Sequence, residues 1–204
     1  MTRDTKKLIL YTAYISILTV SLLISAKITT LIGLTFTVGA FAYAVTFPIT
    51  DTISEVYGRK EAQTLVYLGF IAYLMVVVYS QIAVYLPSAD FWNDNQTAYE
   101  TVIGLVPRIV IASFISYTVS QYHDVWAFHF WKKVTKGKYL WVRNNASTMS
   151  SQVIDTIIFV TIAFYGVVPN DVLADMMIGQ FLIKILIAVI DTPVVYMLVS
   201  WLKK

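Results

Sequence analysis

The chain has 204 residues, of which 58% are hydrophobic and only 13% are charged. This balance is typical of an integral membrane protein and excludes an ordinary soluble domain. The net charge of +3 involves no long basic segment outside the apolar stretches, so no nucleic acid partner is expected. The chain contains no Cys and only two His, which excludes disulfides and thiolate sites and leaves metal catalysis and a bound cofactor unexpected.

Hydropathy and helix-breaking residues divide the chain into alternating spans and connections. The first apolar run is uncharged for about 19 residues, which matches a hydrocarbon core of about 30 Å. We therefore predict an all-α polytopic membrane protein that forms a single transmembrane domain over residues 1–204. Its six transmembrane helices are predicted at residues 8–26, 34–56, 62–86, 102–122, 147–168 and 172–202.

The distribution of basic residues predicts the orientation of these spans. Twelve of the fifteen Lys and Arg residues fall on one side of a six-span arrangement, in the segments 3–7, 59–60, 132–143 and 203–204. The positive-inside rule then places both termini in the cytoplasm. Residues 124–139 combine aromatic and Lys residues and are predicted to form a short interfacial helix between helices four and five, with an anchoring role as the simplest explanation.

Charged residues inside the apolar stretches are the main indication of function. Asp51, Asp155 and Asp191 are each followed by Thr, and Arg108 and Lys184 stand in other spans. Counting about 1.5 Å per residue places Asp155 and Asp191 roughly 12–17 Å from the cytoplasmic ends of their helices. Such residues usually line a solute or ion path, although a static ion pair with Lys184 is the structural alternative.

Two further patterns accompany these charges. The segments around Asp51 and Asp155 are alike over five residues, as in an inverted repeat of two three-helix halves, but chance explains so short a match equally well. Pro48 and Pro107 are expected to loosen their helices and free a carbonyl group toward a ligand, and a kink that serves packing alone explains either proline equally well.

Five motifs in this order resemble the queuosine precursor transporter family, which is grouped with vitamin uptake transporters. They are FPxTDxxxExYG at 47–58, RxxxAS at 108–113, SQxxD at 120–124, WxR at 141–143 and SQxxDT at 151–156. The resemblance extends over nearly the whole chain. It implies a multi-pass inner-membrane importer of 7-deazaguanine bases, such as 7-cyano- or 7-aminomethyl-7-deazaguanine, by a secondary or facilitated mechanism that serves tRNA modification.

The resemblance also suggests how a guanine-like base would be held. A carboxylate of Asp51, Glu55 or Asp155 would accept from its donor edge, Arg108 and Gln152 would serve its acceptor edge, and an aromatic ring such as that of Phe47 would cover its face. The full set of expected substrate-binding residues is Phe47, Thr50, Asp51, Glu55, Arg108, Ser113, Gln121, Gln152, Asp155, Lys184 and Asp191.

Other functions remain open at this point. The alternative transport role is the substrate-binding subunit of an ATP-driven vitamin-type importer, since the chain has no Walker motif of its own. An enzyme is not expected, because His123 and His129 fall on the predicted cytoplasmic connection, away from the deep carboxylates. The expected partners are a small 7-deazapurine and the lipid bilayer, and the sequence does not decide whether two chains form a homodimer.

Overall fold

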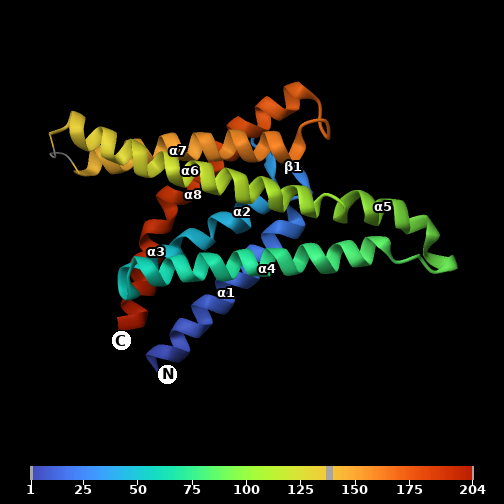
Figure 1. Ribbon diagram of the computed structural model, residues 1–204, viewed down its shortest axis with the longest axis horizontal. Coiled ribbons are helices and arrows are strands. Elements are labelled where there is room, and N and C mark those ends of the chain that lie inside the picture. Colours follow the sequence, from blue (N-terminus) through green and yellow to red (C-terminus); the bar gives the residue numbers. More distant parts are fainter. Residues whose placement is uncertain (1, 137–139, 204) are drawn as a thin grey trace.

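A computed structural model describes residues 2–136 and 140–203, without the side chains of residues 132, 140–145 and 188–192. The chain is mostly helical, as predicted (Figure 1). Its elements in order are α1 (Arg3–Ile24), β1 (Ile28–Leu31), β2 (Leu34–Thr37), α2 (Val38–Ala44), α3 (Thr46–Tyr57), α4 (Arg59–Tyr85), the short 3₁₀ helix η1 (Asp90–Trp92), α5 (Asn93–Ile103), α6 (Val106–Val134), α7 (Leu140–Phe164) and α8 (Asn170–Lys203).

Four helical stretches of the described residues are long and apolar enough to cross a membrane. They are Arg3–Ile24, Arg59–Tyr85, Asp90–Trp131 and Ala146–Phe164, and Pro193–Lys203 is a shorter apolar helix. These stretches confirm a polytopic helical membrane protein, whereas the six spans and the single domain stay predictions. Large apolar side chains such as Leu74, Met75 and Val78 are exposed on α4, as a lipid-facing surface requires.

The second predicted span is interrupted, because α2 ends at Ala44 and α3 begins at Thr46. Pro48 lacks the N–H that would bond to the carbonyl of Ala44, and its ring would crowd that carbonyl, so one straight helix cannot pass through this segment. The Thr46 hydroxyl donates to the Tyr43 carbonyl at 2.5 Å and so satisfies one of the acceptors near the break. The break lets α2 and α3 present side chains to the interior at two different angles.

A β-hairpin follows α1 and replaces the start of the predicted second span, an element that the prediction did not include. Strands β1 and β2 pair antiparallel, with Leu31 opposite Leu34. Ile32 and Gly33 form the turn with φ of 53° and 75°, a backbone that suits a two-residue hairpin turn. The hairpin lies against α8, where a Cβ at Gly179 would overlap the backbone of Thr35.

Helices α6 and α7 pack side by side along much of their length (Figure 1). The prediction of a separate interfacial helix over residues 124–139 was wrong for its described part, because residues 124–134 continue α6 without a break. No Gly or Pro occurs between Pro107 and residue 136, so nothing in the sequence ends the helix earlier. Pro107 itself lies in the first turn of α6, where its missing N–H is not needed, so it starts the helix rather than loosening it.

The two ends of the chain meet at the same end of the molecule (Figure 1). The Lys6 ammonium, which is buried, donates to the Trp201 carbonyl at 2.8 Å. Lys7 forms an ion pair with Glu61 at the start of α4, and the Tyr11 hydroxyl donates to the same carboxylate at 2.7 Å. These contacts tie α1 to the end of α8 and to the start of α4.

Candidate functional site: a polar cavity among the helices

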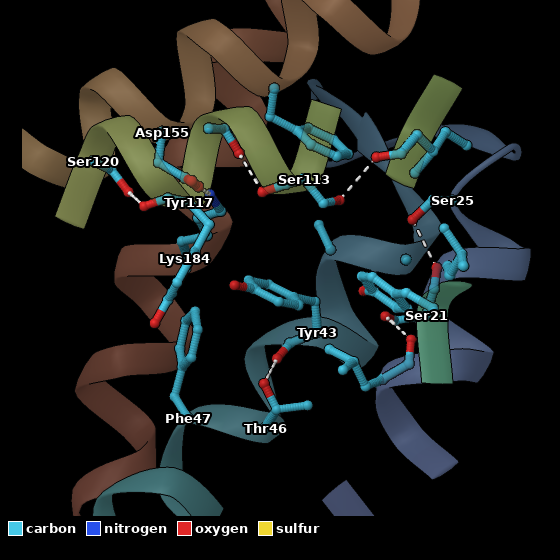
Figure 2. Close-up of a pocket in the computed structure, with 18 of the residues that line it drawn as sticks. Ser21, Ser25, Tyr43, Thr46, Phe47, Ser113, Tyr117, Ser120, Asp155 and Lys184 are labelled. Carbon is cyan, nitrogen blue, oxygen red and sulfur yellow. Dashed lines mark hydrogen bonds and ion pairs between the residues drawn. The ribbon is translucent and has the colours of Figure 1, made fainter. Parts of the chain in front are cut away.

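A cavity of about 290 Å³ lies among α1, α2, α3, α4, α6, α7 and α8 (Figure 2). Its volume is at the lower end of the range of roughly 300–1,000 Å³ for small-molecule sites, which favours a small solute. Figure 2 shows Ser21 and Ser25 of α1 on one side and Asp155 of α7 with Lys184 of α8 on the other. Tyr43, Thr46 and Phe47 reach the cavity from both sides of the break between α2 and α3.

One ion pair dominates the electrostatics of this cavity. The Lys184 Nζ donates to Asp155 Oδ2 at 2.6 Å and approaches the Thr156 hydroxyl oxygen at 3.2 Å. The side chains of Lys184 and Asp155 are only 5% and 14% exposed. The desolvation free energy of two buried charges is larger than that of a pair on the surface. Each charge therefore depends on its partner to remain buried. A ligand that offers both donors and acceptors can replace either partner.

Hydroxyl groups add acceptors to the cavity wall. The hydroxyls of Ser21, Ser25 and Ser113 each donate to a carbonyl of their own helix, at 2.7, 2.7 and 2.9 Å. A hydroxyl has one hydrogen to donate, so these oxygens can still accept a further hydrogen bond. The cavity is therefore well supplied with groups that would receive N–H donors.

Gln152 carries the clearest unsatisfied group in the cavity. Its Oε1 is buried and has no hydrogen-bond partner within the described structure, and the residue lines the cavity one turn before Asp155. An unpartnered buried acceptor costs about 1–3 kcal/mol. Such a cost is common where a ligand supplies the missing donor.

Aromatic side chains form the remaining walls. Tyr43 and Phe47 meet edge to face with ring centroids 5.2 Å apart, and Phe70 meets Tyr117 in the same manner at 5.3 Å. Tyr14, Tyr73 and Phe159 complete the aromatic lining. Flat rings with polar groups at one side suit a flat heteroaromatic solute, because ring faces stack while the polar groups bond to its edge.

The structure brings most of the expected site residues to this cavity. The residues that line it are Phe47, Thr50, Ser113, Gln121, Gln152, Asp155 and Lys184. Asp51 and Glu55 are exposed on α3 and do not line it. Asp191 belongs to α8, but its side chain lies outside the described part of the structure.

Arg108 also stands apart from the cavity lining. Its Nε and one terminal nitrogen donate to the carbonyls of Ile162 and Tyr165, at 2.6 and 2.5 Å. These carbonyls lie at the end of α7, where the helix leaves acceptors without intrahelical partners. In this conformation Arg108 joins the start of α6 to the end of α7.

Several cavity residues were missing from the predicted set. Tyr14, Phe70, Tyr73 and Phe159 occur in apolar runs where a core or lipid-facing role is just as consistent with the pattern. Thr37 and Gln180 are bonded to each other at 3.3 Å, 143 residues apart in sequence, and both are buried. Gln180 could have been predicted as a cavity residue, because an uncharged amide in the apolar stretch of α8 also needs a hydrogen-bond partner.

The fold and the cavity together define a multi-pass membrane protein with an internal polar cavity. Residues 37–198 match the family model described as "Putative vitamin uptake transporter", and the chain belongs to this family. The transporter description and the apolar helices place the protein in the cell membrane.

Known proteins with similar sequences carry a more specific name. The chain is 36% identical over 172 residues to the "Probable queuosine precursor transporter" of Bacillus subtilis strain 168, covering 83% of this chain and 74% of that protein. It is 27% identical over 138 residues to the "Queuosine precursor transporter" of Escherichia coli K12, covering 66% and 58% of the two chains. A "Probable queuosine precursor transporter" of Haemophilus influenzae Rd is 28% identical over 130 residues, covering 62% and 51%. No solved structure gives a significant match to this chain.

Proposed function

We propose that this protein imports queuosine precursors of the 7-deazaguanine type across the cell membrane, by a secondary or facilitated mechanism. The observation that carries the proposal is the buried Lys184–Asp155 pair in an aromatic cavity of about 290 Å³. The names of the B. subtilis and E. coli relatives support the choice of substrate.

A guanine-like base fits the functional groups that line the cavity. Its ring N–H and exocyclic amine donate along one edge, and the oxygens of Asp155 and Gln152 can accept from them. Its carbonyl oxygen accepts, and the Lys184 ammonium can donate to it. The ring face packs against Phe47 or one of the cavity tyrosines.

We further propose six membrane crossings within one domain, with both termini in the cytoplasm. The broken pair α2 and α3 would supply one crossing and α8 another, beside the four long apolar stretches. The contact between Lys6 and Trp201 supports this count, since two ends on one side of a membrane require an even number of crossings. The basic segments at these ends support the cytoplasmic side.

Replacing Gln152 with Leu tests the binding site without disturbing the ion pair. We expect binding of 7-cyano-7-deazaguanine to the detergent-solubilised protein to weaken by at least about tenfold, equivalent to ~1.4 kcal/mol. Thermal stability should stay equal or rise, because the change removes a buried oxygen that has no partner. Isothermal titration and thermal melting measure the two quantities on the same sample.

Gln81→Leu is the matched control. Gln81 on α4 also holds a buried amide atom without a hydrogen-bond partner in the described structure, but it does not line the cavity. We expect Gln81→Leu to change thermal stability in the same direction as Gln152→Leu and to leave binding of the base unchanged. Equal binding by wild type and Gln152→Leu would contradict the proposed site. Uptake by liposomes that contain this chain alone would separate the proposal from an ATP-driven importer.

A further inference from the structure

A second polar cluster joins α6 and α7 next to the cavity. The Ser151 hydroxyl lies 3.1 Å from His123 Nδ1 and 3.3 Å from Asp124 Oδ1. The Ser151 hydroxyl also donates to the carbonyl of Ser147 one turn earlier, at 2.8 Å, so its single hydrogen can turn to either acceptor, and Ser151 is only 5% exposed. His123 was expected on a connection between spans, but it lies within α6 and faces this cluster.

The order of these groups differs from that of a hydrolase. In a Ser-His-Asp triad the imidazole lies between the carboxylate and the hydroxyl, so that it can take the hydroxyl proton. Here the Ser151 hydroxyl lies between His123 and Asp124. A hydroxyl in that position can accept from the ring N–H and donate to the carboxylate, which is the arrangement needed to pass a proton along.

The cluster adjoins the cavity along both helices. Ser120 and Gln121, which line the cavity, come three and two residues before His123 on α6. On α7, Asp155 is one turn after Ser151 and therefore on the same side of the helix. From His123 the helix α6 runs on to Lys133 near its end, and Lys136 follows two residues after the helix. The polar groups thus form a series from the ion pair toward the basic end of the molecule.

We propose that Ser151, His123 and Asp124 form a proton path from Asp155 to the basic side of the membrane, and that transport of the base is coupled to proton entry. This inference rests on the proposed function. It adds an activity, proton symport, to the import of the base.

The ion pair supplies the coupling. In the empty cavity the Lys184 ammonium bonds to Asp155 at 2.6 Å, and the two opposite charges are buried together. When the carbonyl of a bound base takes the ammonium, Asp155 loses its cation and accepts a proton on one oxygen, while its other oxygen can still accept from an N–H of the base. When the base leaves, Lys184 returns to Asp155 and expels the proton. Base and proton therefore bind together and are released together.

The released proton is accounted for at each atom. It moves from Asp155 through water in the cavity to the free Nε2 of His123. His123 then gives its Nδ1 hydrogen to the Ser151 oxygen while the Ser151 hydrogen passes to Asp124, which releases it to solvent. One proton enters and one leaves, and the serine keeps one hydrogen throughout. The imidazole changes tautomer and resets by exchange with solvent.

The charged and titratable groups around the proposed path are compatible with these proton transfers. Among the described residues, Asp155 bonds to Lys184 of α8 and shares the cavity with Tyr14, Tyr43, Tyr73 and Tyr117. Asp124 lies 3.3 Å from the Ser151 hydroxyl, and the ring of Trp126 lies 5.7 Å from the imidazole. Histidine ordinarily changes charge near neutral pH, so it suits the exchange of protons with the cytoplasm.

Liposomes that contain the purified protein and an internal pH-sensitive dye test the coupling. With the outside more acidic, addition of 7-cyano-7-deazaguanine should acidify the interior, and the pH gradient should drive accumulation of the base. Base accumulation that ignores the gradient, with no change in internal pH, would overturn the inference while leaving the proposed import standing. Failure of the wild type to bind the base would overturn both.

Ser151→Ala tests the path itself, with Ser150→Ala as the matched control. The Ser150 hydroxyl donates to the carbonyl of Ser147 at 2.9 Å, as a local bond within α7, whereas the contacts to His123 and Asp124 belong to Ser151. We expect Ser151→Ala to bind the base and to exchange it in the absence of a gradient, but to lose gradient-driven accumulation. Ser151→Thr, which keeps the hydroxyl, should retain accumulation, as should Ser150→Ala.

Asp124→Asn provides a second variant should Ser151→Ala not fold. The amide still accepts from Ser151 but cannot release a proton, so accumulation should again be lost while exchange persists. Normal proton entry in a folded Ser151→Ala or Asp124→Asn protein would overturn the assignment of the path.

Discussion

The two Asp-Thr pairs that the structure describes in full have nearly the same sequence and different surroundings. Asp155 of α7 lines the cavity and bonds to Lys184, and Thr156 is within 3.2 Å of the same ammonium. Asp51 of α3 is exposed and lies outside the cavity lining, and Thr52 donates only to the carbonyl of Pro48, at 2.6 Å. An acidic residue in an apolar stretch therefore does not by itself identify a binding group.

Helix phase explains the difference. On α7, Gln152, Asp155 and Phe159 share one face and all line the cavity. On α3 the residues that line it are Thr46, Phe47 and Thr50, and Asp51 follows Thr50 by about 100° of helical rotation. The break at Val45 sets the direction of α3 and thus decides that Thr50, rather than Asp51, faces inward.

Uptake of the base should show the largest difference between substitutions of Asp155 and of Asp51. Asp155→Asn should reduce uptake of labelled base in liposomes by at least about tenfold, because a change of ~1.4 kcal/mol in binding already has that effect. The amide oxygen can still accept from Lys184 and so offsets part of the cost of the buried ammonium, and the protein should insert and purify as a folded species. Asp51→Asn should leave uptake within about twofold, as for other exposed positions. Equal losses in the two variants would remove the distinction between the motifs.

Stability should show the next largest difference. Lys184→Met leaves the Asp155 carboxylate buried without its cation, and breaking such a pair costs about 3–5 kcal/mol. Adding Asp155→Asn to the same protein should restore much of the loss, because no unpaired charge remains. Thermal melting in detergent, or unfolding by denaturant, measures both. A single Lys184→Met variant as stable as wild type would show that the pair is not held in a buried setting.

Substitutions of Thr156 and Thr52 should differ by a smaller amount in their effect on stability. Thr156→Val removes an oxygen that contacts the Lys184 ammonium, and hydrogen bonds to charged groups contribute about 1.5–3 kcal/mol. Thr52→Val removes only a bond to its own helix and should cost less than about 1.5 kcal/mol. The same melting assay compares the two substitutions, which are identical in chemistry. A larger loss at Thr52 would reverse the comparison.

The sequence was a good guide to the long helices and a poorer guide to the short elements. Predicted spans one, three and five overlap closely with α1, α4 and α7, because an apolar run of that length has few alternatives. The hairpin at Ile28–Leu31 and Leu34–Thr37 was missed, although its Thr-rich alternation around Ile32 and Gly33 is typical of strands. A long apolar segment beside it obscured that short signal.

The candidate site could be predicted in part, because polar residues are conspicuous in apolar spans. Polar residues in spans drew attention to Gln152, Asp155 and Lys184, which meet in one cavity. The pairing of Asp155 with Lys184, 29 residues later, depends on how α7 packs against α8. A single sequence does not specify that packing. The same holds for Arg108, whose partners are backbone carbonyls and so carry no side-chain signature.

The close contact between Gly179 and the hairpin limits how this protein can change shape. With no side chain between α8 and the backbone of Thr35, the helix and the hairpin pack in direct contact, and the bond between Thr37 and Gln180 joins them a second time. Lys184 is little more than one helical turn beyond Gly179. Any tilt of α8 that displaces its ammonium must therefore carry Ile32, the outermost point of the hairpin, along with it.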